Sequence, residues 1–372
     1  IKRYAEIVSL KKKIMESNET ILYIDLKKLE SNFQYLNNLI KHKTKIIAVV
    51  KAFGYGHGDI EISRKLESLG IYALWVSDFE EGVELREAGI KCKIIIANTG
   101  TKSYNKILKY KLDVVVYSKK ILALYCKNKN PIDIHLKINT GMNRYGFEEK
   151  EIDEIYSIIK KNKHLNLLSI CSHLASSERN DLRKINLLQL KKFSSINSNF
   201  NNKYDKKISF HILNSHGLLN YPDFKYDFVR IGIGLYGSAN DINLKQISKL
   251  ISVVSQIREI KKGSGVGYGS SYIAEKKIKM AIIPIGYADG LNRKLGCNNG
   301  VVLIKNNKCK IIGEISMDSL AVNISDLNVK EGDKVEIFGE NLSVVEIASK
   351  INTIPYEIYS TLNRRIKRVY LN

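Results

Sequence analysis

Short apolar runs alternate with longer amphipathic segments between Lys45 and Gly234. This alternation predicts successive β-α units around a parallel sheet, because buried parallel strands are short and apolar and helices join them. The runs expected as strands are Ile46–Val50, Tyr72–Val76, Lys93–Ala97, Leu112–Val116, Ile132–Ile138, Leu167–Ser172, Ile208–Leu213 and Phe228–Ile233. Helical spacing is clearest over Glu80–Ala88 and Asp181–Phe193. These strands and their crossovers predict a closed (β/α)8 barrel of the TIM type.

The pattern changes near residue 243, where apolar runs are separated by turn signals such as Asn299-Gly300. The strands expected there are Leu250–Ile260, Ile278–Pro284, Val301–Ile304, Cys309–Ile312, Leu320–Ile324 and Lys334–Phe338. The expected fold class is therefore α/β, with an N-terminal barrel and a mostly β C-terminal domain. We expect an N-terminal extension over residues 1–20, the barrel over residues 21–242 and the β domain over residues 243–372. The barrel segment opens with a strand and a helix across Ile21–Ile40.

Charge is the unusual feature of the composition. The 372 residues include 60 Lys and Arg against 38 Asp and Glu, a formal net charge of +22, which could attract nucleic acid or an anionic membrane. The lysines recur along almost every expected helix, for example at Lys119 and Lys120, and form no single stripe with interleaved aromatic residues. We therefore expect a solvated surface, with no nucleic-acid partner.

The five cysteines are an odd number without C-x-x-C spacing, so they indicate neither a disulfide framework nor a zinc site. No metal is expected. No apolar run has the length of a membrane span, and the N-terminus lacks the plan of a signal peptide. These features predict a cytoplasmic protein without a membrane partner.

Reactive side chains follow several of the expected barrel strands. They are Lys51, Lys137, Arg144, His173, Asn214, Ser215 and Arg230. Each alone has an ordinary interpretation, such as a solvated lysine or a hydrogen-bonded histidine. Because the carboxyl ends of barrel strands meet at one mouth, together they predict a site for an anionic cofactor and substrate.

Lys51 leaves a buried run and enters the segment Ala52-Phe53-Gly54-Tyr55-Gly56-His57-Gly58. A lysine in this setting can present a partly desolvated amine to a carbonyl carbon, which is what a Schiff base requires. The stretch resembles the cofactor-lysine signature of alanine racemases, which are fold-type III pyridoxal-phosphate enzymes.

The resemblance continues in order from about residue 21 to the end of the chain. The similar segments are His135 to Gly146, Ser172 to Ala175, Asn214-Ser215, Val229 to Gly237, Gly267 to Tyr272, Ile285 to Gly290 and Ser316-Met317-Asp318. It implies a racemase that uses pyridoxal 5′-phosphate to interconvert L- and D-alanine, and so supplies D-alanine for bacterial peptidoglycan.

The resemblance also implies roles for individual residues. Lys51 and Tyr268 become bases on opposite faces of the substrate, as racemisation requires. The cofactor-binding set is Lys51, Tyr55, His173, Asn214, Ser215, Arg230, Gly232 and Ile233, and the substrate-binding set is Arg144, Tyr287, Met317 and Asp318.

Further expectations concern residues of the same segments. Lys137 stands where the family often has a carbamylated lysine. Arg230 faces the pyridine nitrogen, which an arginine keeps unprotonated, so that side reactions such as transamination are limited. Tyr268 and Met317 reach the barrel mouth of a second subunit, so the catalytic unit is a homodimer with shared sites. His173 and Arg144 are suited to favouring the Tyr268 phenolate.

Departures from the family pattern leave the substrate open. Arg364 stands where many alanine racemases have a tyrosine near the substrate methyl, and Asn139 stands where aspartate is common. A serine or broader-specificity racemase of the same fold is therefore the alternative. A fold-type III decarboxylase is disfavoured by Arg230, and a non-catalytic pyridoxal-phosphate-binding protein lacks a β domain with a residue like Tyr268. A nucleic-acid-binding module is the remote option.

Overall fold

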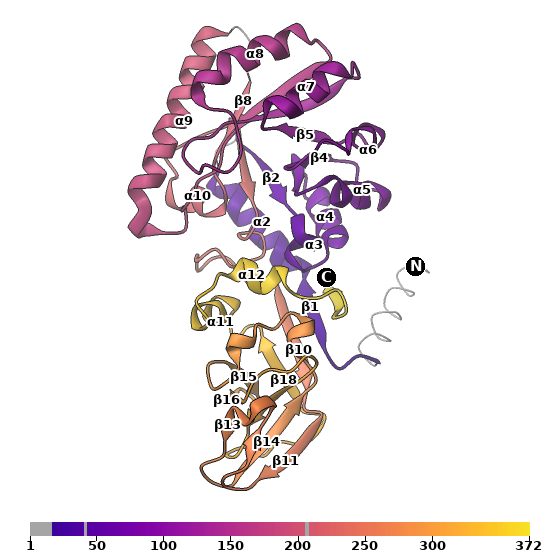
Figure 1. Cartoon of the computed structure of the whole chain (residues 1–372), viewed down its shortest axis with the longest axis vertical. Coiled ribbons are helices and arrows are strands. Elements are labelled where there is room, and N and C mark those ends of the chain that lie inside the picture. The colour runs from indigo at the N-terminus through magenta and orange to yellow at the C-terminus, as the bar shows by residue number, and fades with distance from the viewer. Residues whose placement is uncertain (1–16, 41–42, 205–207) are drawn as a thin grey trace. The chain divides into compact units, whose positions relative to one another are not determined.

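The structure is a computed structural model that describes residues 17–40, 43–204 and 208–372. Its internal contacts divide the chain into two compact units (Figure 1). The barrel unit comprises residues 30–54 and 59–244. The β unit comprises the described residues through 29, residues 55–58 and residues 245–372. Of the expected extension over residues 1–20, all but 17–20 lies outside the described residues.

The barrel unit is built on eight strands in the order β8-β7-β6-β5-β4-β3-β2-β9, and every pair is parallel. Their bounds are β2 (Lys45–Val49), β3 (Ala73–Val76), β4 (Lys93–Ile96), β5 (Asp113–Val116), β6 (Ile132–Lys137), β7 (Leu165–Cys171), β8 (Ser209–His211) and β9 (Phe228–Ile231). The two end strands of this order, β8 and β9, are joined by a hydrogen bond that the Arg230 N–H donates to the Leu213 carbonyl at 3.0 Å. The predicted barrel class is confirmed, and each predicted strand is present within a few residues.

Helices separate these strands along the chain, as the amphipathic segments predicted (Figure 1). They are α3 (Lys51–Tyr55), α4 (Asp59–Ser68), α5 (Phe79–Glu87), α6 (Tyr104–Lys109), α7 (Lys119–Lys127), α8 (Ile152–Lys161), α9 (Arg183–Lys203) and α10 (Ser215–Asn220). Helix α2 (Leu26–Leu39) comes before the first of these strands, β2. Helix α9 runs past its predicted end at Phe193. The reason is that Ile196 and Phe200 continue its buried stripe through a stretch rich in Ser and Asn.

The β unit contains a sheet in the order β11-β14-β17-β16-β15-β18-β10-β1-β19, and a separate pair, β12-β13. The bounds are β1 (Ile21–Asp25), β10 (Ser248–Val253), β11 (Gln256–Ile260), β12 (Gly265–Val266), β13 (Tyr272–Ile273), β14 (Ile278–Ile283), β15 (Val301–Ile304), β16 (Asn307–Ile312), β17 (Leu320–Asn323), β18 (Lys334–Phe338) and β19 (Lys367–Leu371). Helices α11 (Val344–Lys350) and α12 (Pro355–Ser360) complete the unit. The mostly β C-terminal domain was predicted correctly.

Two details of the β unit differ from the sequence expectation. Strand β1 pairs with β10 and β19 in this sheet, whereas the pattern placed residues 21–25 at the start of the barrel segment. The run Leu250–Ile260 forms two strands, because β10 pairs with β18 while β11 pairs with β14. Both differences concern the choice of partner strand, which local hydrophobic periodicity does not encode.

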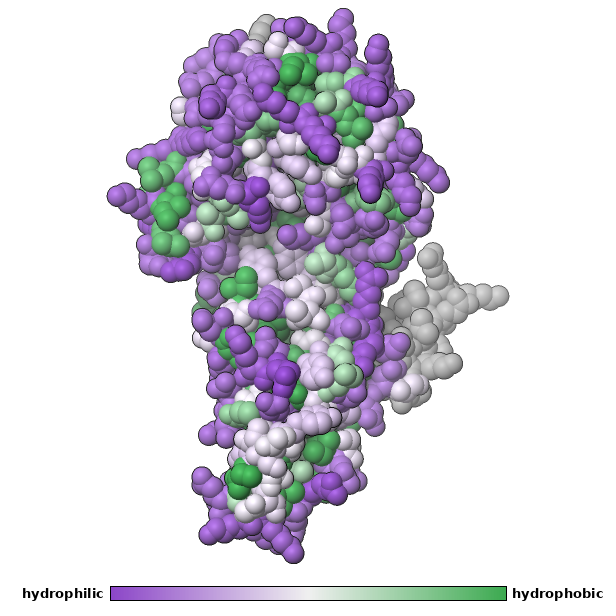
Figure 2. Space-filling model, in the orientation of Figure 1, coloured by the Kyte–Doolittle hydropathy of each residue, from purple (hydrophilic) through white to green (hydrophobic). Residues whose placement is uncertain are grey.

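The surface is mostly hydrophilic, with small hydrophobic patches, one of them over α9 (Figure 2). The exposed apolar residues of that helix are Ile185 and Leu188. Within the described part of the chain, no helix has both the length and the apolar character needed to cross a membrane.

Candidate functional site

Lys51 lies in a strained turn directly after β2. The three residues that follow it, Ala52, Phe53 and Gly54, have positive φ angles of 54°, 55° and 58°. A left-handed conformation costs a residue with a side chain about 1–2 kcal/mol, so the surrounding structure must hold it. The Gly54 N–H donates to the Val50 carbonyl at 2.9 Å. Strain concentrated beside one lysine is typical of a functional site.

Glu81, in the first turn of α5, holds this turn from the neighbouring strand end. One carboxylate oxygen accepts from the Ala52 N–H and the other from the Ser77 N–H, each at 2.6 Å. Burial raises the pKa of Glu81 in spite of these bonds. The helical pattern predicted over Glu80–Ala88 includes Glu81 but does not indicate this role. A carboxylate in the first helical turn after a strand end was the available signal.

Four basic side chains share the mouth of the barrel unit: Lys51, Lys137, Arg144 and Arg230. Desolvation and the charge of Arg144 lower the pKa of Lys51. Burial, with Arg230 and Arg144 nearby, lowers the pKa of Lys137 to about 8. Burial, with the charge of Arg144 added, lowers the pKa of Arg230 to about 10. Cations that destabilise one another in this way fit a site for an anionic group, which would relieve the repulsion.

Arg230, on β9, is fixed by hydrogen bonds from both terminal nitrogens of its guanidinium. Nη1 donates to His211 Nδ1 at 2.6 Å, and Nη2 donates to His173 Nδ1 at 3.0 Å and to the Ser172 carbonyl at 2.6 Å. The Trp75 ring lies 5.3 Å from the guanidinium carbon, a cation–π contact. No described residue accepts from Nε. One N–H donor is therefore left for an acceptor that a ligand supplies.

His173 is neutral, because burial and the nearby charge of Arg230 lower its pKa well below the usual range. Its Nδ1 accepts from Arg230, so its proton lies on Nε2. Neutral His173 therefore offers a hydrogen-bond donor at Nε2 and adds no positive charge. Trp75 and His211 were missed by the sequence analysis. An aromatic residue and a histidine inside apolar parallel strands were the available signals.

Ser215, the first residue of α10, brings together the segments expected to hold a phosphate. Its Oγ accepts from the N–H groups of Gly232 and Gly234, each at 3.1 Å. Asn214 caps α10 by accepting from the Gly217 N–H at 2.8 Å. The Gly232 N–H is thus already used, whereas the Ile233 N–H donates to no described residue. The Ser215 hydroxyl proton and the Ile233 N–H are the donors suited to a phosphate.

Arg144 lies on an exposed loop after β6 that Asn139 organises. The Asn139 side-chain oxygen accepts from the N–H groups of Gly141 and Asn143, at 3.1 and 3.0 Å. Its amide nitrogen donates to Glu148 at 2.7 Å. An aspartate could accept the same two bonds but could not donate to a carboxylate, so Asn139 and Glu148 form a matched pair.

The remaining predicted site residues belong to the β unit. Tyr268, Tyr287 and Met317 are among its exposed large hydrophobic side chains, at 71%, 41% and 53% exposure. Tyr55 is buried, with its ring centroid 5.8 Å from that of Tyr356, and burial raises its pKa.

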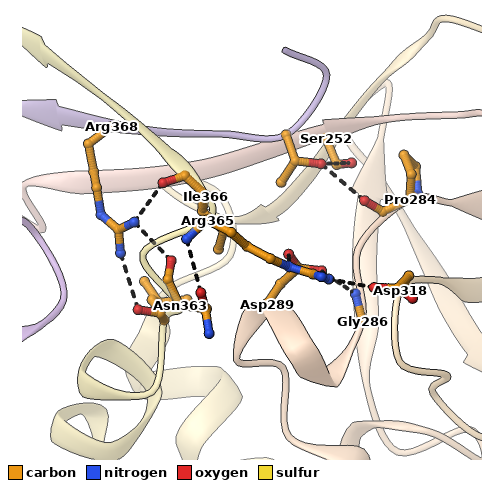
Figure 3. Close-up of polar contacts among 11 residues, drawn as sticks. Ser252, Pro284, Gly286, Asp289, Asp318, Asn363, Arg365, Ile366 and Arg368 are labelled. Atoms are coloured by element: carbon orange, nitrogen blue, oxygen red, sulfur yellow. Dashed lines mark hydrogen bonds and ion pairs between the residues drawn. The ribbon is translucent and has the colours of Figure 1, made fainter.

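Arg365 ties together the two loops that carry Tyr287, Met317 and Asp318. Its guanidinium lies between Asp289 and Asp318 (Figure 3), with Nε to Asp289 Oδ1 and Nη2 to Asp318 Oδ1 both at 2.7 Å. The backbone joins the same loops, because the Ala288 N–H donates to the Met317 carbonyl at 3.0 Å. Arg365 was not among the predicted site residues, and it positions Asp318 directly.

Replacing Arg365 by alanine is expected to lower the free energy of unfolding by about 1–3 kcal/mol, because it leaves the buried Asp289 carboxylate without its charged donor. The matched control is Arg293→Ala, which breaks an exposed pair with Glu314 and should cost less than about 1 kcal/mol. Urea unfolding of both variants measures the difference. Equal losses would show that Arg365 is only a surface charge.

Among the described residues, no group of three or more His, Cys, Asp or Glu side chains could hold a metal ion. All five cysteines are free thiols. The donors gathered at the barrel mouth are basic side chains and N–H groups, which suit phosphate and carboxylate groups instead of cations.

Comparison with known proteins covers nearly the whole chain. The family model for the alanine racemase N-terminal domain matches residues 24–240, and that for the C-terminal domain matches residues 247–370. Alanine racemase 2 of Bacillus subtilis is 34% identical over 95% of each chain. The alanine racemase of Fusobacterium nucleatum is 36% identical over 94% of this chain and 99% of its own.

Solved structures of alanine racemases are also similar to this chain. The alanine racemase of Clostridium difficile 630 has a TM-score of 0.88 and 30% identity, covering 95% of this chain and 96% of its own. The alanine racemase of Bartonella henselae with covalently bound pyridoxal phosphate has a TM-score of 0.86 and 30% identity, covering 95% of this chain and all of its own (100%).

Proposed function

This chain belongs to the alanine racemase family, and from that membership we propose that it interconverts L- and D-alanine with pyridoxal 5′-phosphate as cofactor. The observation that carries the proposal is the barrel mouth. There Lys51 on its strained turn lies among three further cations, and the Arg230 Nε–H has no acceptor among the described residues. Its product would supply D-alanine for peptidoglycan.

The residues present fit three groups of the cofactor, which are its aldehyde, its pyridine nitrogen and its phosphate. Lys51 would hold it covalently, and the Arg230 Nε–H would meet the pyridine nitrogen. The Ser215 hydroxyl, the Ile233 N–H and the Tyr55 hydroxyl would take the phosphate, with Asn214 and Gly232 holding that loop in place. Bound pyridoxal phosphate supplies an electron sink for the α-carbon of an amino acid.

A racemase also needs two bases, one on each face of the substrate. Lys51 would remove or return the α proton on one face of the substrate, and Tyr268 would do so on the other. Because Tyr268 and Met317 are exposed, we propose that each reaches the barrel mouth of a second copy in a homodimer. The His173 Nε2–H can donate to the phenolate, and the fixed charges of Arg144 and Arg230 favour that anion.

The substrate would be bound through its carboxylate by Arg144, with Tyr287, Met317 and Asp318 around its side chain. Arg364 is exposed and polar where the family often has tyrosine, which keeps serine as a second candidate substrate. The test is optical rotation of pure enzyme with pyridoxal phosphate and either L-alanine or L-serine. We expect rotation to decay to zero fastest with L-alanine, and constant rotation with both would refute the proposal.

Lys137 is suited to carbamylation, because a lysine with a pKa of about 8 is about half neutral at that pH. The neutral amine can attack CO2 and lose a proton, which replaces a cation beside Arg144 with an anion. With ¹³C-labelled CO2 at constant concentration, the carbamate signal in ¹³C NMR should grow from about pH 6 to about pH 9. Lys137→Met is the control, and an unchanged signal in that variant would assign the carbamate elsewhere.

A further inference from the structure

A line of buried polar side chains crosses the interior of the barrel unit and ends on Arg230. It runs through Asp113 on β5, His135 on β6, Ser169 on β7 and His211 on β8. The steps are 3.6 Å from Asp113 Oδ2 to His135 Nε2, 2.6 Å from His135 Nδ1 to Ser169 Oγ, 3.0 Å from Ser169 Oγ to His211 Nε2, and 2.6 Å from His211 Nδ1 to Arg230 Nη1.

Burial makes this line unusual. His135, Ser169 and His211 are each 0% exposed, and Asp113 and Arg230 are 6% and 4% exposed. The interior of a (β/α)8 barrel is ordinarily filled by branched apolar residues, and such residues would avoid the cost of removing polar groups from water. A polar line that spans neighbouring strands therefore points to a function beyond packing.

The position of every proton along the line follows from Arg230. A guanidinium has donors only, so His211 Nδ1 must accept and the proton of this ring lies on Nε2. Burial and the charge of Arg230 lower the pKa of His211 well below its usual range, so the ring is neutral. The Nε2–H donates to Ser169, and we assign the Ser169 hydroxyl as the donor to His135 Nδ1, which lies 2.6 Å away.

At the Asp113 end of the line, the hydrogen bonds have the same donor-to-acceptor direction. With Nδ1 of His135 accepting, its proton lies on Nε2, which has no hydrogen-bond partner among the described residues but faces the Asp113 carboxylate at 3.6 Å. Asp113 is in turn 3.4 Å from Lys93 Nζ. The negative charge of Asp113 favours this tautomer, and each bond along the line makes the next acceptor stronger.

We propose that Asp113, His135 and Ser169 are positioning residues that fix the His211 tautomer, and thereby hold the Arg230 guanidinium with its Nε–H presented to the cofactor. The effect of this role on catalysis rests on the proposed function. The hydrogen bonds of the line do not depend on it. If His211 instead carried its proton on Nδ1, two donors would meet at 2.6 Å and Arg230 would have to turn.

The first test reads the tautomers directly. The purified protein, saturated with pyridoxal phosphate and labelled with ¹⁵N-histidine, gives long-range ¹H–¹⁵N spectra of its seven histidine rings. We expect His135 and His211 each to carry a single ring proton, on Nε2. A proton on Nδ1 of either ring, or on both nitrogens, would overturn the inference.

The second test breaks the line at Ser169. Ser169→Ala should displace the His211 ring signals and lower kcat by about three- to tenfold, the scale of one hydrogen bond, with KM little changed. Ser169→Thr keeps the hydroxyl and should restore both. Asp113→Asn is a second break, which should lower kcat and move the His135 signals. The matched control is Ser63→Ala, a buried hydroxyl on α4 outside the line, which should change neither.

The outcomes separate this inference from the proposed function. Wild-type kcat with unchanged His211 signals in Ser169→Ala would refute the positioning role even if racemisation is confirmed. The expected tautomers without any racemisation would refute the proposed function and leave the geometry of the line standing. If Ser169→Ala fails to fold, Ser169→Thr and Asp113→Asn carry the same comparison.

Discussion

Replacing Lys51 by alanine is expected to abolish racemisation in both directions, with a loss of about four orders of magnitude or more in kcat. Lys51 would serve both as the attachment point of the cofactor and as the base on one face of the substrate, so its removal deletes two functions. Rotation of L-alanine and of D-alanine, followed separately, measures both directions.

The fold should survive this change. Lys51 is exposed, and its turn is held by the Gly54 N–H, which donates to the Val50 carbonyl, and by the Ala52 N–H, which donates to the Glu81 carboxylate. Replacing the Lys51 side chain keeps both bonds. The midpoint of thermal unfolding without cofactor should therefore stay within a few degrees of wild type. Lys119→Ala, which removes an exposed lysine paired with Glu154, is the control and should retain full activity. Racemisation by Lys51→Ala at more than a few per cent of wild type would disprove the role of Lys51.

Replacing Tyr268 by phenylalanine is the change with the second largest expected effect. It removes the phenolic oxygen and keeps the ring, so kcat should fall by about two to four orders of magnitude, the range attributed to a general acid or base. Tyr268 is exposed in the single chain, and the loss should come without loss of stability. Tyr272→Phe, a change of the same kind a few residues away, is the control.

Mixing the two inactive variants tests whether the sites are shared between subunits. If Tyr268 serves the barrel of its partner, a dimer of Lys51→Ala with Tyr268→Phe contains one intact site. Random exchange makes half of the dimers mixed, so about a quarter of wild-type activity should return. If mixing after complete exchange restores no activity, each site is built within one chain and the shared-site proposal is wrong.

The barrel and most of its mouth could be predicted because each signal is local. A short apolar run followed by a helical pattern predicts a strand and its crossover, and the residue after the run falls at the carboxyl end. Lys51, His173 and Ser215 were found in this way. The resemblance then ordered these residues into roles, and the family comparisons agree with it over both domains.

What the sequence did not reveal depends on contacts between distant segments. Glu81 lies 29 residues from the Ala52 N–H that it holds, and Ser169 lies 42 residues from His211. Strand β1 pairs with β10 more than 200 residues later, so no local pattern assigns it to the β unit. The neutral state of His173 was equally hidden, because it follows from burial beside Arg230.

The most direct measurement of the central claim is borohydride reduction of the pure enzyme with pyridoxal phosphate, followed by peptide mapping. We expect the cofactor mass to be fixed on the single peptide that contains Lys51, and Lys51→Ala to take up none. A label on another lysine, or no label in the wild-type protein, would contradict it.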